Sequence, residues 1–350
     1  MKVNGRRIFR ILRRFLLWTA ASLLLLVLLS ALLLYLFQDK LEQKLISRLN
    51  KQLVTEIEVK NIDFTLFKNF PYITADFQEV KAKDATPKKE DYLLQAHEVL
   101  LEFNLFDLIW GEYTIQRLQI NRGEINLRVY GDGTDNYHFW KADTLQTADS
   151  SDFRFDLQRI KLVETSISYI NIPSGQQYSF MFTNAKAAGR FSEKEFAVDL
   201  KGTFRVNRML IGEINYLAGS ILTIDALMEA NTETDTYVFS KGEIGIGEVF
   251  LELLGTIIWS DAVHSVNMQA QSPEVPVKDF ISLIPAQYAG YAESFSKEGS
   301  ISVKAELKGL VNDHQQPALN VGFELENGRI EQPKTGVALS NLKANGTLII

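Results

Sequence analysis

Apolar and polar residues alternate in short runs from about residue 55 to the end of the chain. Successive side chains of a β-strand point to opposite faces, so this period of two predicts strands with one apolar and one wet face. In segment 197–206 the apolar positions are Val198, Leu200, Gly202, Phe204 and Val206. In segment 300–308 they are Ile301, Val303, Ala305 and Leu307. We therefore expect the body of the protein to be mainly β.

Turn signals separate these runs. The dipeptides Asp132-Gly133, Asn327-Gly328 and Asn345-Gly346 are of the type found in β-hairpins. Polar stretches at 83–91 and 144–152 predict loops. Segment 242–247 (GEIGIG) has its glycines in the wrong order for a dinucleotide-binding loop, and we interpret it as a strand with bulges or a close backbone approach.

Helical patterns are few. Residues 38–53 predict a short amphipathic helix, whose apolar face consists of Leu41, Leu45, Ile46, Leu49 and Leu53. Segment 105–110 predicts one turn between strands. Segment 275–295 predicts one or two short helices, broken near Pro285.

One-sided strands create a packing problem. About 15–18 strands carry an apolar face that has to leave water, and the chain has too little helix to cover it. Three arrangements remain open: two sheets packed as a sandwich, a closed barrel, or a curved sheet filled by something else; the pattern alone favours a sandwich or barrel. Residues 116–127 also resemble residues 158–169 at an offset of 42, and sequential repeats favour an extended architecture.

An uncharged run of 23 residues, 12 of them leucine, extends from Phe15 to Phe37. A helix of this length measures about 35 Å, enough to cross a hydrocarbon core of about 30 Å. Trp18 and Tyr35 lie near its ends, where aromatic rings prefer the membrane interface. A cleaved signal peptide has a shorter apolar region and a small-residue cleavage site, so we predict an uncleaved membrane anchor.

Charge is distributed unevenly around this run. Six basic residues and no acidic residue precede it, and the positive-inside rule then leaves the N-terminus in the cytoplasm and residues 39–350 outside. The arginines expected to set this topology are Arg6, Arg7, Arg10, Arg13 and Arg14. Residues 39–350 hold 31 basic and 43 acidic residues, so we expect no binding to nucleic acid. The chain has no cysteine and hence no disulfide or thiolate chemistry.

The sequence shows no pattern of a catalytic or metal site. The four histidines, His97, His138, His264 and His314, have no ligand spacing. Segment 131–136 lacks the distal glutamate of a calcium loop and predicts a turn. No nucleophile-elbow or phosphate-loop pattern is present, so we expect neither an enzyme nor a bound cofactor.

The order of several segments resembles the AsmA-like proteins of Gram-negative envelopes. After the basic tail, anchor and amphipathic helix, segment 59–80 with its Phe70-Pro71 step looks like the opening hairpin of that family. Segment 93–127 matches the next part of the family. Asp132-Gly133 with Asn136 resembles its Asp-Gly…Asn turn, and segment 285–309 looks like a later helix–strand unit. The similarity spans nearly the whole chain and rests on order rather than on one specific motif.

The resemblance implies a long, twisted, mostly antiparallel β-sheet that curls into an apolar groove. At about 4.8 Å per strand, 15–18 strands would make a groove about 70–85 Å long, which is short for a bridge across the envelope. It implies an inner-membrane protein of outer-membrane biogenesis with its body in the periplasm, phospholipids as ligands and a possible outer-membrane protein partner. Its divisions are a basic tail (1–14), the anchor (15–37), the amphipathic helix (38–54), an AsmA-like β module (55–150) and a β-groove (151–350) expected to continue beyond residue 350.

The groove of such a protein shields acyl chains from water. Each exposed CH₂ costs about 0.8 kcal/mol, so a sixteen-carbon chain in water costs about 12 kcal/mol. The lining residues expected here are Val198, Leu200, Phe204, Val249, Leu251, Leu253, Ile257, Ile301, Val303 and Leu307. Periodicity leaves open whether they meet a ligand or pack in an ordinary core.

Two other functions stay open at this point. The first is a scaffold for the assembly of outer-membrane β-barrel proteins, which would bind by strand addition at an exposed sheet edge. The second is an enzyme with a compact β-sandwich body.

Overall fold

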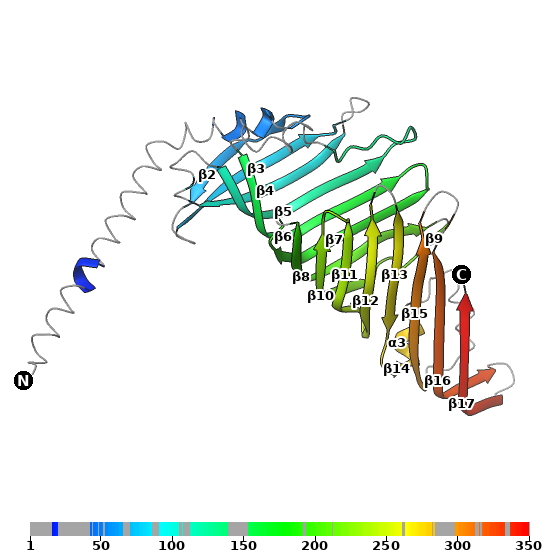
Figure 1. Cartoon of the computed structure of the whole chain (residues 1–350). Coiled ribbons are helices and arrows are strands. Elements are labelled where there is room, and N and C mark those ends of the chain that lie inside the picture. Colours follow the sequence, from blue (N-terminus) through cyan, green and yellow to red (C-terminus); the bar gives the residue numbers. More distant parts are fainter. Residues whose placement is uncertain are drawn as a thin grey trace, which may run out of the picture.

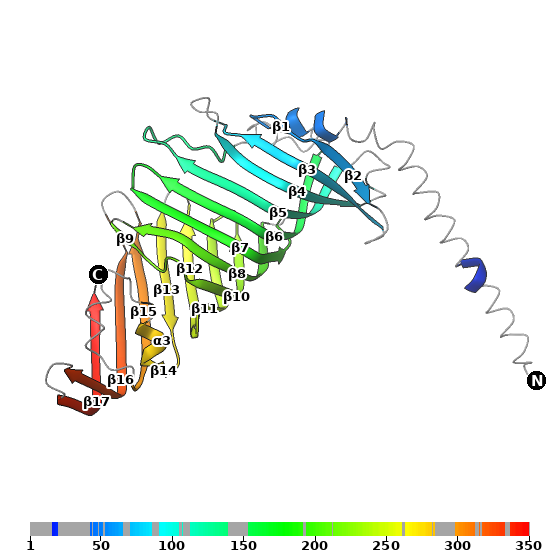
Figure 2. The same cartoon turned by 180° about the vertical axis from the view of Figure 1, so that it is seen from behind.

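The computed structural model describes residues 16–19, 43, 45–47, 49–51, 53–65, 71–85, 91–104, 107, 113–138, 153–191, 194–211, 213–260, 263–281, 283, 298–311, 315, 317–332 and 337–349. Within these residues 17 strands form one sheet (Figures 1 and 2). The strands are β1 (Ile57–Glu58), β2 (Asn61–Thr65), β3 (Tyr72–Lys83), β4 (Tyr92–Asn104), β5 (Tyr113–Val129), β6 (Phe153–Asn171), β7 (Gln176–Gly189), β8 (Glu195–Ile211), β9 (Ile214–Asn215), β10 (Ile221–Asn231), β11 (Thr236–Ile246), β12 (Val249–Trp259), β13 (His264–Gln271), β14 (Val275–Pro276), β15 (Ser300–Leu310), β16 (Ala318–Gln332) and β17 (Val337–Ile349). The expectation of a mainly β body is confirmed.

The strands follow one another across the sheet in chain order. Three pairs of strands share one position each, because β1 and β2 both pair with β3, β9 and β10 with β8, and β13 and β14 with β15. The sheet therefore has fourteen positions and is about 60 Å wide, shorter than expected. All neighbours are antiparallel except β5 and β6, which are parallel.

The sheet is open and twisted. In the view of Figure 1 the direction of the strands changes steadily, from oblique in β3–β6 to nearly vertical in β12–β17. Adjacent strands rotate by roughly 20–25°, so twist of this kind accumulates over many strands. Among the described strands, β2 pairs with β3 and β17 with β16, and these two outermost strands do not pair with each other. The sandwich or barrel favoured by the pattern alone is therefore wrong, because the apolar strands follow one another in a single layer.

The first strands pack under a short helix. The described residues between 43 and 51 are helical, as predicted, and Leu45 and Leu49 are buried against β3–β5. Phe103 from β4 is only 1% exposed in this cluster. The amphipathic face predicted from residues 38–53 thus closes the apolar side of the first strands; Leu41 lies outside the described residues.

A line of irregular backbone crosses β3–β6. Glu79, Arg122 and Glu164 adopt left-handed conformations on β3, β5 and β6, with φ of 52°, 49° and 47°. At the same level of β4, His97 lies opposite Glu79, and their side chains are 2.6 Å apart. Each irregularity shifts the alternation by one residue, so that apolar side chains return to the same face beyond it. The alternating pattern of the sequence gives no sign of these bulges.

Gly123 on β5 belongs to this line, and its neighbours leave little room for a side chain. A Cβ there would lie 2.6 Å from a methyl carbon of Ile120. Thr165 from β6, fully buried beside it, bonds through its hydroxyl to the carbonyl oxygens of Ile120 and Val163 at 3.1 and 2.9 Å. A side chain at Gly123 would need Ile120 to shift, and Thr165, 3.3 Å from the same Cβ position, restricts the remaining space.

The turn predictions have mixed outcomes. The Asp132-Gly133 turn is confirmed, with Gly133 at φ 81°. Asn327-Gly328 and Asn345-Gly346 are not hairpin turns, and these predictions are wrong. Asn327 forms a bulge inside β16 at φ 51°, and Asn345-Gly346 continues β17 opposite Glu324 and Phe323. An asparagine side chain favours bulges as well as turns, because it tolerates the left-handed region.

Segment 242–247 matches the bulged strand predicted for it. Gly242 and Gly245 lie in β11, whose pairing with β12 is irregular between Phe239 and Glu243. A Cβ on Gly245 would lie 2.4 Å from the hydroxyl of Thr223 on β10. Gly247 then takes φ 60° in the tight connection to β12.

The remaining loop and helix predictions fall partly outside the described residues. Asp84, Ala85 and Asp91 lie outside strands, as predicted for segment 83–91, whereas segment 144–152 is not described. Asp107 is helical, in agreement with a turn between β4 and β5. Segment 275–295 begins as strand β14 and continues as helix α3 (Val277–Ile281). Residues 284–295 of this segment lie outside the described part.

The predicted membrane anchor also lies mostly outside the described residues. Leu16 to Thr19 are helical, and the Trp18 side chain is exposed. Phe15, Tyr35, Phe37 and the five topology-setting arginines are not described. Among the described residues, no helix has the length and apolar character needed to cross a membrane. The anchor therefore stays a prediction from the sequence.

Candidate functional site

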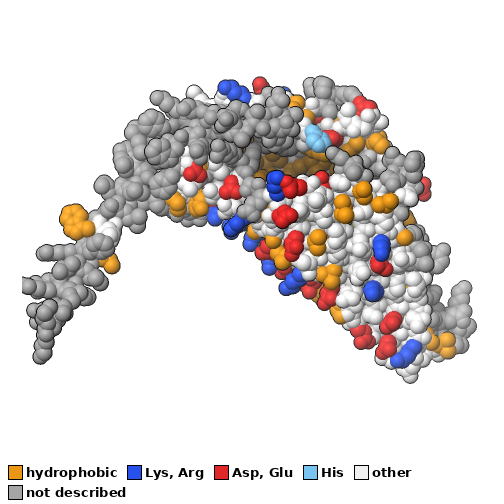
Figure 3. Space-filling model, in the orientation of Figure 1, with side chains coloured by type: hydrophobic (Ala, Val, Ile, Leu, Met, Phe, Trp, Pro, Cys, Tyr) orange, Lys and Arg blue, Asp and Glu red, His pale blue; other side chains and the backbone are white. Residues whose placement is uncertain are grey.

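One face of the sheet carries an unbroken row of apolar positions, and we call it the inner face. The row crosses the sheet from β2 to β16, each member lying beside the next on the neighbouring strand. Its members are Phe64, Ala75, Leu101, Leu118, Ile160, Ala187, Leu200, Ala226, Gly242, Leu253, Ala270, Ala305 and Val321. Figure 3 shows a recess lined by hydrophobic side chains, whereas the lower face in that view is mostly polar. No polar side chain interrupts this row.

All ten lining residues predicted from the sequence lie on the inner face. They come from β8, β12 and β15, and the registers of these strands place them opposite apolar partners such as Ala226, Ala270 and Leu325. The buried members are Val198, Val249 and Val303. The partly exposed members are Leu200, Phe204, Leu251, Leu253, Ile257, Ile301 and Leu307. Period-two reasoning therefore found the correct face of each strand.

Small side chains dominate the middle of this row. Ala187, Ala226, Gly242, Ala270 and Ala305 lie between larger residues from β7 to β15. A Cβ on Gly242 would lie 2.9 Å from the carbonyl oxygen of Leu253, so no side chain fits there without a shift. A face of alternating large and small residues is uneven and leaves shallow space above the small ones.

Within the described part of the chain, two segments cover parts of the inner face. The helix around Leu45 and Leu49 covers the first strands. Leu283, just after α3, packs against a second cluster centred on Val206, Leu222 and Ile246. Toward the last strands the inner face is more open, since Phe323 on β16 is 38% exposed.

Aromatic rings gather on the inner face of β6–β8. Phe180 meets Phe204 edge-on at 5.7 Å between ring centroids, and Phe182 lies 5.2 Å from the same ring. Tyr169 and Tyr178 stack at 6.0 Å on the adjoining part of β6 and β7. Burial, followed by the nearby Tyr169, raises the pKa of the Tyr178 hydroxyl. Sequence reasoning missed the rings of β7, although Tyr178, Phe180 and Phe182 occupy every second position of the strand.

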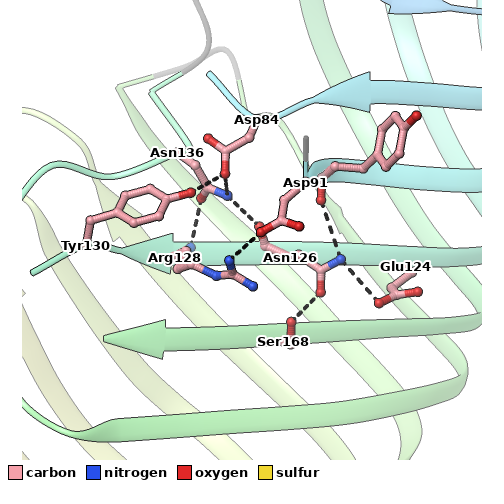
Figure 4. Close-up of polar contacts among 9 residues, drawn as sticks. Asp84, Asp91, Glu124, Asn126, Arg128, Tyr130, Asn136 and Ser168 are labelled. Atoms are coloured by element: carbon pink, nitrogen blue, oxygen red, sulfur yellow. Dashed lines mark hydrogen bonds and ion pairs between the residues drawn. The ribbon is translucent and has the colours of Figure 1, made fainter. Parts of the chain in front are cut away.

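The outer face holds a polar cluster at the end of β5 (Figure 4). Asn136 is 2% exposed; its amide nitrogen donates to the backbone oxygen of Asn126 at 2.8 Å and to Asp84 at 3.2 Å. Its oxygen accepts from the backbone nitrogen of Arg128 at 2.8 Å, and the Tyr130 hydroxyl donates to Asp84. These bonds tie the Asp132-Gly133 turn to the end of β3. The cluster is thus a structural tie whose polar groups bond to one another.

Carboxylates meet on the outer face of β2–β4. Burial first, then repulsion and a hydrogen bond from Glu98, raises the pKa of Asp76 to about 6. One carboxyl oxygen of Asp76 is buried without a hydrogen-bond partner. Gln78 donates to Asp63 at 2.8 Å on the neighbouring strand. Among the described residues, no three histidine or carboxylate side chains are grouped as metal ligands.

The candidate site is therefore a surface rather than a pocket with a reactive group. The described histidines have ordinary contacts: His97 with Glu79, His138 with Asp135 at 2.7 Å, and His264 stacked on Trp259 at 4.4 Å. His314 lies outside the described residues. Comparison with protein-family models, with curated proteins and with solved structures yields no match to this chain.

Proposed function

We propose that this protein shields the acyl chains of phospholipids on the inner face of its sheet and transfers them between membranes. The observation that carries the proposal is the apolar row that crosses thirteen of the fourteen strand positions without a polar side chain. Such a surface binds hydrocarbon without direction or specificity, because hydrophobic attraction scales with the apolar area removed from water. A carrier that must release each lipid needs this kind of weak, extended contact.

Room for a guest supports the same proposal. An apolar face that is an ordinary protein core meets a second layer at native packing density. Here Ala187, Ala226, Ala270 and Ala305 leave shallow space, and Phe323 is partly exposed. An acyl chain on this face would remove both its own surface and that of the sheet from water, about 0.8 kcal/mol for each CH₂ covered.

The cellular setting belongs to the proposal as well. We place the chain in the bacterial inner membrane through residues 15–37, with the arginine-rich N-terminus in the cytoplasm and the sheet in the periplasm. In that setting the sheet works in outer-membrane biogenesis, as the resemblance to AsmA-like proteins implies, with an outer-membrane protein as possible partner. The resemblance implies a hairpin in segment 59–80, and the antiparallel pairing of β2 with β3, from Asn61 opposite Gln78, supports this part of the proposal.

The test compares two neighbouring leucines on opposite faces. Leu253 belongs to the apolar row, whereas Leu254 is exposed on the outer face. We expect Leu253→Glu to lower the amount of phospholipid that co-purifies with the full chain in mild detergent several-fold, since it places a charge where hydrocarbon binds. Leu254→Glu should keep the wild-type amount. Equal lipid content in both variants and the wild type, or no lipid at all, would refute the proposal.

One observation favours a second candidate, a scaffold for outer-membrane β-barrel proteins. In the described part of the chain, β17 pairs with β16 on one side only. An edge strand offers unpaired backbone groups to another strand. A photo-crosslinker at Lys343 on β17 should then trap nascent barrel proteins, whereas the lipid proposal predicts lipid adducts from a crosslinker at Leu253.

A further inference from the structure

Three lysines lie directly opposite one another on the outer face. Lys161 on β6 pairs with Lys186 on β7, and Lys186 pairs with Lys201 on β8. Side chains directly opposite on neighbouring strands have their Cβ atoms about 4.5–5.5 Å apart, so the row spans about 10 Å. Like charges in this position repel and destabilise a sheet. The arrangement is also unusual for a body with 31 basic and 43 acidic residues.

The three lysines belong to a longer row of polar and charged residues on the outer face. Among the described residues, carboxylates lie within ion-pair distance of only one of the three lysines. From β5 to β15 this outer row consists of Gln119, Lys161, Lys186, Lys201, Asp225, Glu243, Glu252, Gln271 and Lys304. The Lys201 ammonium lies 3.1 Å from Asp225 and 3.9 Å from Asp199. Within the residues that the structure describes, neither Lys161 nor Lys186 has a carboxylate within ion-pair distance. Two positive charges therefore remain uncompensated.

The lysines line a hollow. Its volume is about 330 Å³, and its walls are formed by Lys161, Asn184, Lys186, Lys201, Gly202 and Thr203. The pairing of β7 with β8 is irregular between Phe182 and Asn184, which places Asn184 beside Thr203 at the edge of the hollow. Every side chain of the lining ends in a group that donates hydrogen bonds, and no carboxylate is among them.

We propose that this hollow binds a phosphate group, either free or as part of a phosphate ester. Phosphate carries close to two negative charges and several acceptor oxygens, which matches two uncompensated ammonium groups together with the donors of Asn184 and Thr203. A carboxylate would supply one charge and two oxygens. The site is independent of the apolar row, because it lies on the opposite face of the sheet.

A phosphate at this position has two sources: a small soluble phosphate, or the headgroup of a phospholipid. Both present the same chemistry to the lysines. We therefore compare three probes on the full chain in detergent micelles: inorganic phosphate, glycerol 3-phosphate, and micelles containing phosphatidic acid, with phosphatidylcholine micelles as the reference. Binding of the first two indicates a soluble ligand, and binding of phosphatidic acid alone indicates a headgroup.

The decisive variant is Lys186→Gln, matched by Lys304→Gln. Lys186 is the middle lysine of the three, whereas Lys304 lies in the same outer row between Gln271 and Gly322, away from other lysines. We expect Lys186→Gln to weaken binding of the effective probe about tenfold or more, because one charge-assisted contact is lost. Lys304→Gln should leave binding unchanged.

Folding does not confound this comparison. Lys186→Gln removes repulsion between like charges, so its melting temperature should equal or exceed that of the wild type. The proposal is overturned if none of the probes binds, or if Lys304→Gln weakens binding as much as Lys186→Gln, which would mean general attraction to a charged surface. Leu253→Glu, on the inner face, should leave phosphate binding intact even if lipid binding is lost.

Discussion

Strands near the two ends of the sheet have the same alternating pattern, yet the apolar side chains are buried near the first end and exposed near the last. On β4, Phe103 is 1% exposed beneath the helix around Leu45 and Leu49. On β16, Phe323 points to the same face and is 38% exposed. The comparison shows that alternation determines which face of a strand is apolar, whereas a second layer determines whether that face becomes a core.

The covering helix explains the difference. Leu45 and Leu49 come from a segment that precedes the sheet and folds back over β3–β5. At β15–β17 the described elements above the inner face are limited to the five-residue α3 and its surroundings. Among the described residues, the N-terminal region thus resembles an ordinary two-layer domain, whereas the C-terminal strands form a single sheet with one apolar side. The following predictions test this contrast.

The largest effect is expected from Phe103→Ala. Deleting a fully buried ring removes its contacts and leaves a cavity, which costs about 3–5 kcal/mol of unfolding free energy. The matched change Phe323→Ala should cost about 1 kcal/mol or less, because that ring is partly in water. Urea denaturation of both variants measures the two costs. Similar costs would mean that the last strands are covered as tightly as the first.

The polar tie of the N-terminal region should give the next effect. Asn136→Ala removes the bonds to Asp84 and to the backbone of Asn126 and Arg128, and the backbone oxygen of Asn126 and nitrogen of Arg128 lose these partners. We expect a loss of about 2–3 kcal/mol in urea denaturation. Thr134→Ala in the same turn is the control, because the bonds of Thr134 to Asp132 are exposed. A loss in the control equal to that of Asn136→Ala would contradict the role of the tie.

How far the sequence predicts this fold depends on the kind of feature. Faces of strands are predictable, because a period of two is local: Leu200, Leu253 and Val303 lie where alternation places them. Backbone irregularities are not, since a charged residue such as Glu79 or Arg122 gives no signal of a left-handed conformation. The openness of the sheet also escapes local reasoning, because it depends on which segments fold over which strands.

The repeat at an offset of 42 has a physical explanation. It compares residues 116–127 with 158–169, and these lie on β5 and β6, the parallel pair of the sheet. Arg117 pairs with Arg159 and Leu127 with Tyr169, so each pair of similar residues lies side by side. Neighbouring parallel strands in register share the same environment on both faces, and they select similar residues. The repeat thus predicted a spatial neighbour rather than a separate unit.

The difference between local patterns and long-range contacts also explains which parts of the candidate site could be predicted from the sequence. The face on which the ten residues expected to line a groove lie was predictable, because each strand carries its own pattern. The row of three lysines was not, because Lys161, Lys186 and Lys201 are far apart in the chain and become neighbours only through the register of β6–β8. Register depends on bulges such as the one before Asn184. The sequence gives no signal for such a bulge.

An intermediate effect is expected from adding volume to the apolar row at its two ends. Ala75 on β3 is fully buried, whereas Ala305 on β15 is partly exposed. Ala75→Leu should overpack the N-terminal core and cost about 1–3 kcal/mol. Ala305→Leu should be close to neutral, because the larger side chain extends from a partly exposed position. Thermal melting of the two variants separates them, and an equal loss at both sites would remove the distinction between the two regions.

The smallest effect concerns pH and the outer face of the first strands. The pKa of Asp76 is raised to about 6, mainly by burial and then by Glu98, so the folded state holds this proton more tightly than the unfolded chain does. The contribution of Asp76 to stability is therefore fully present below about pH 4, is lost between about pH 4 and pH 6, and stays lost above. Asp76→Asn removes this loss: it should change little near pH 4 and stabilise by up to about 1 kcal/mol at about pH 8, allowing for screening by solvent.

Glu98 provides the internal control for this titration. Glu98→Gln removes the repulsion that contributes to the raised pKa of Asp76, so in its presence Asp76→Asn should stabilise less at high pH. Urea denaturation of the two single variants and the double variant, at low and high pH, measures the coupling. A stabilisation by Asp76→Asn that is the same at both pH values would show that the amide improves packing and that the Asp76 proton has no part in stability. A variant in the C-terminal strands, Leu254→Glu, serves as a second control. It is far from Asp76, so the pH dependence of the stabilisation by Asp76→Asn should be the same in its presence.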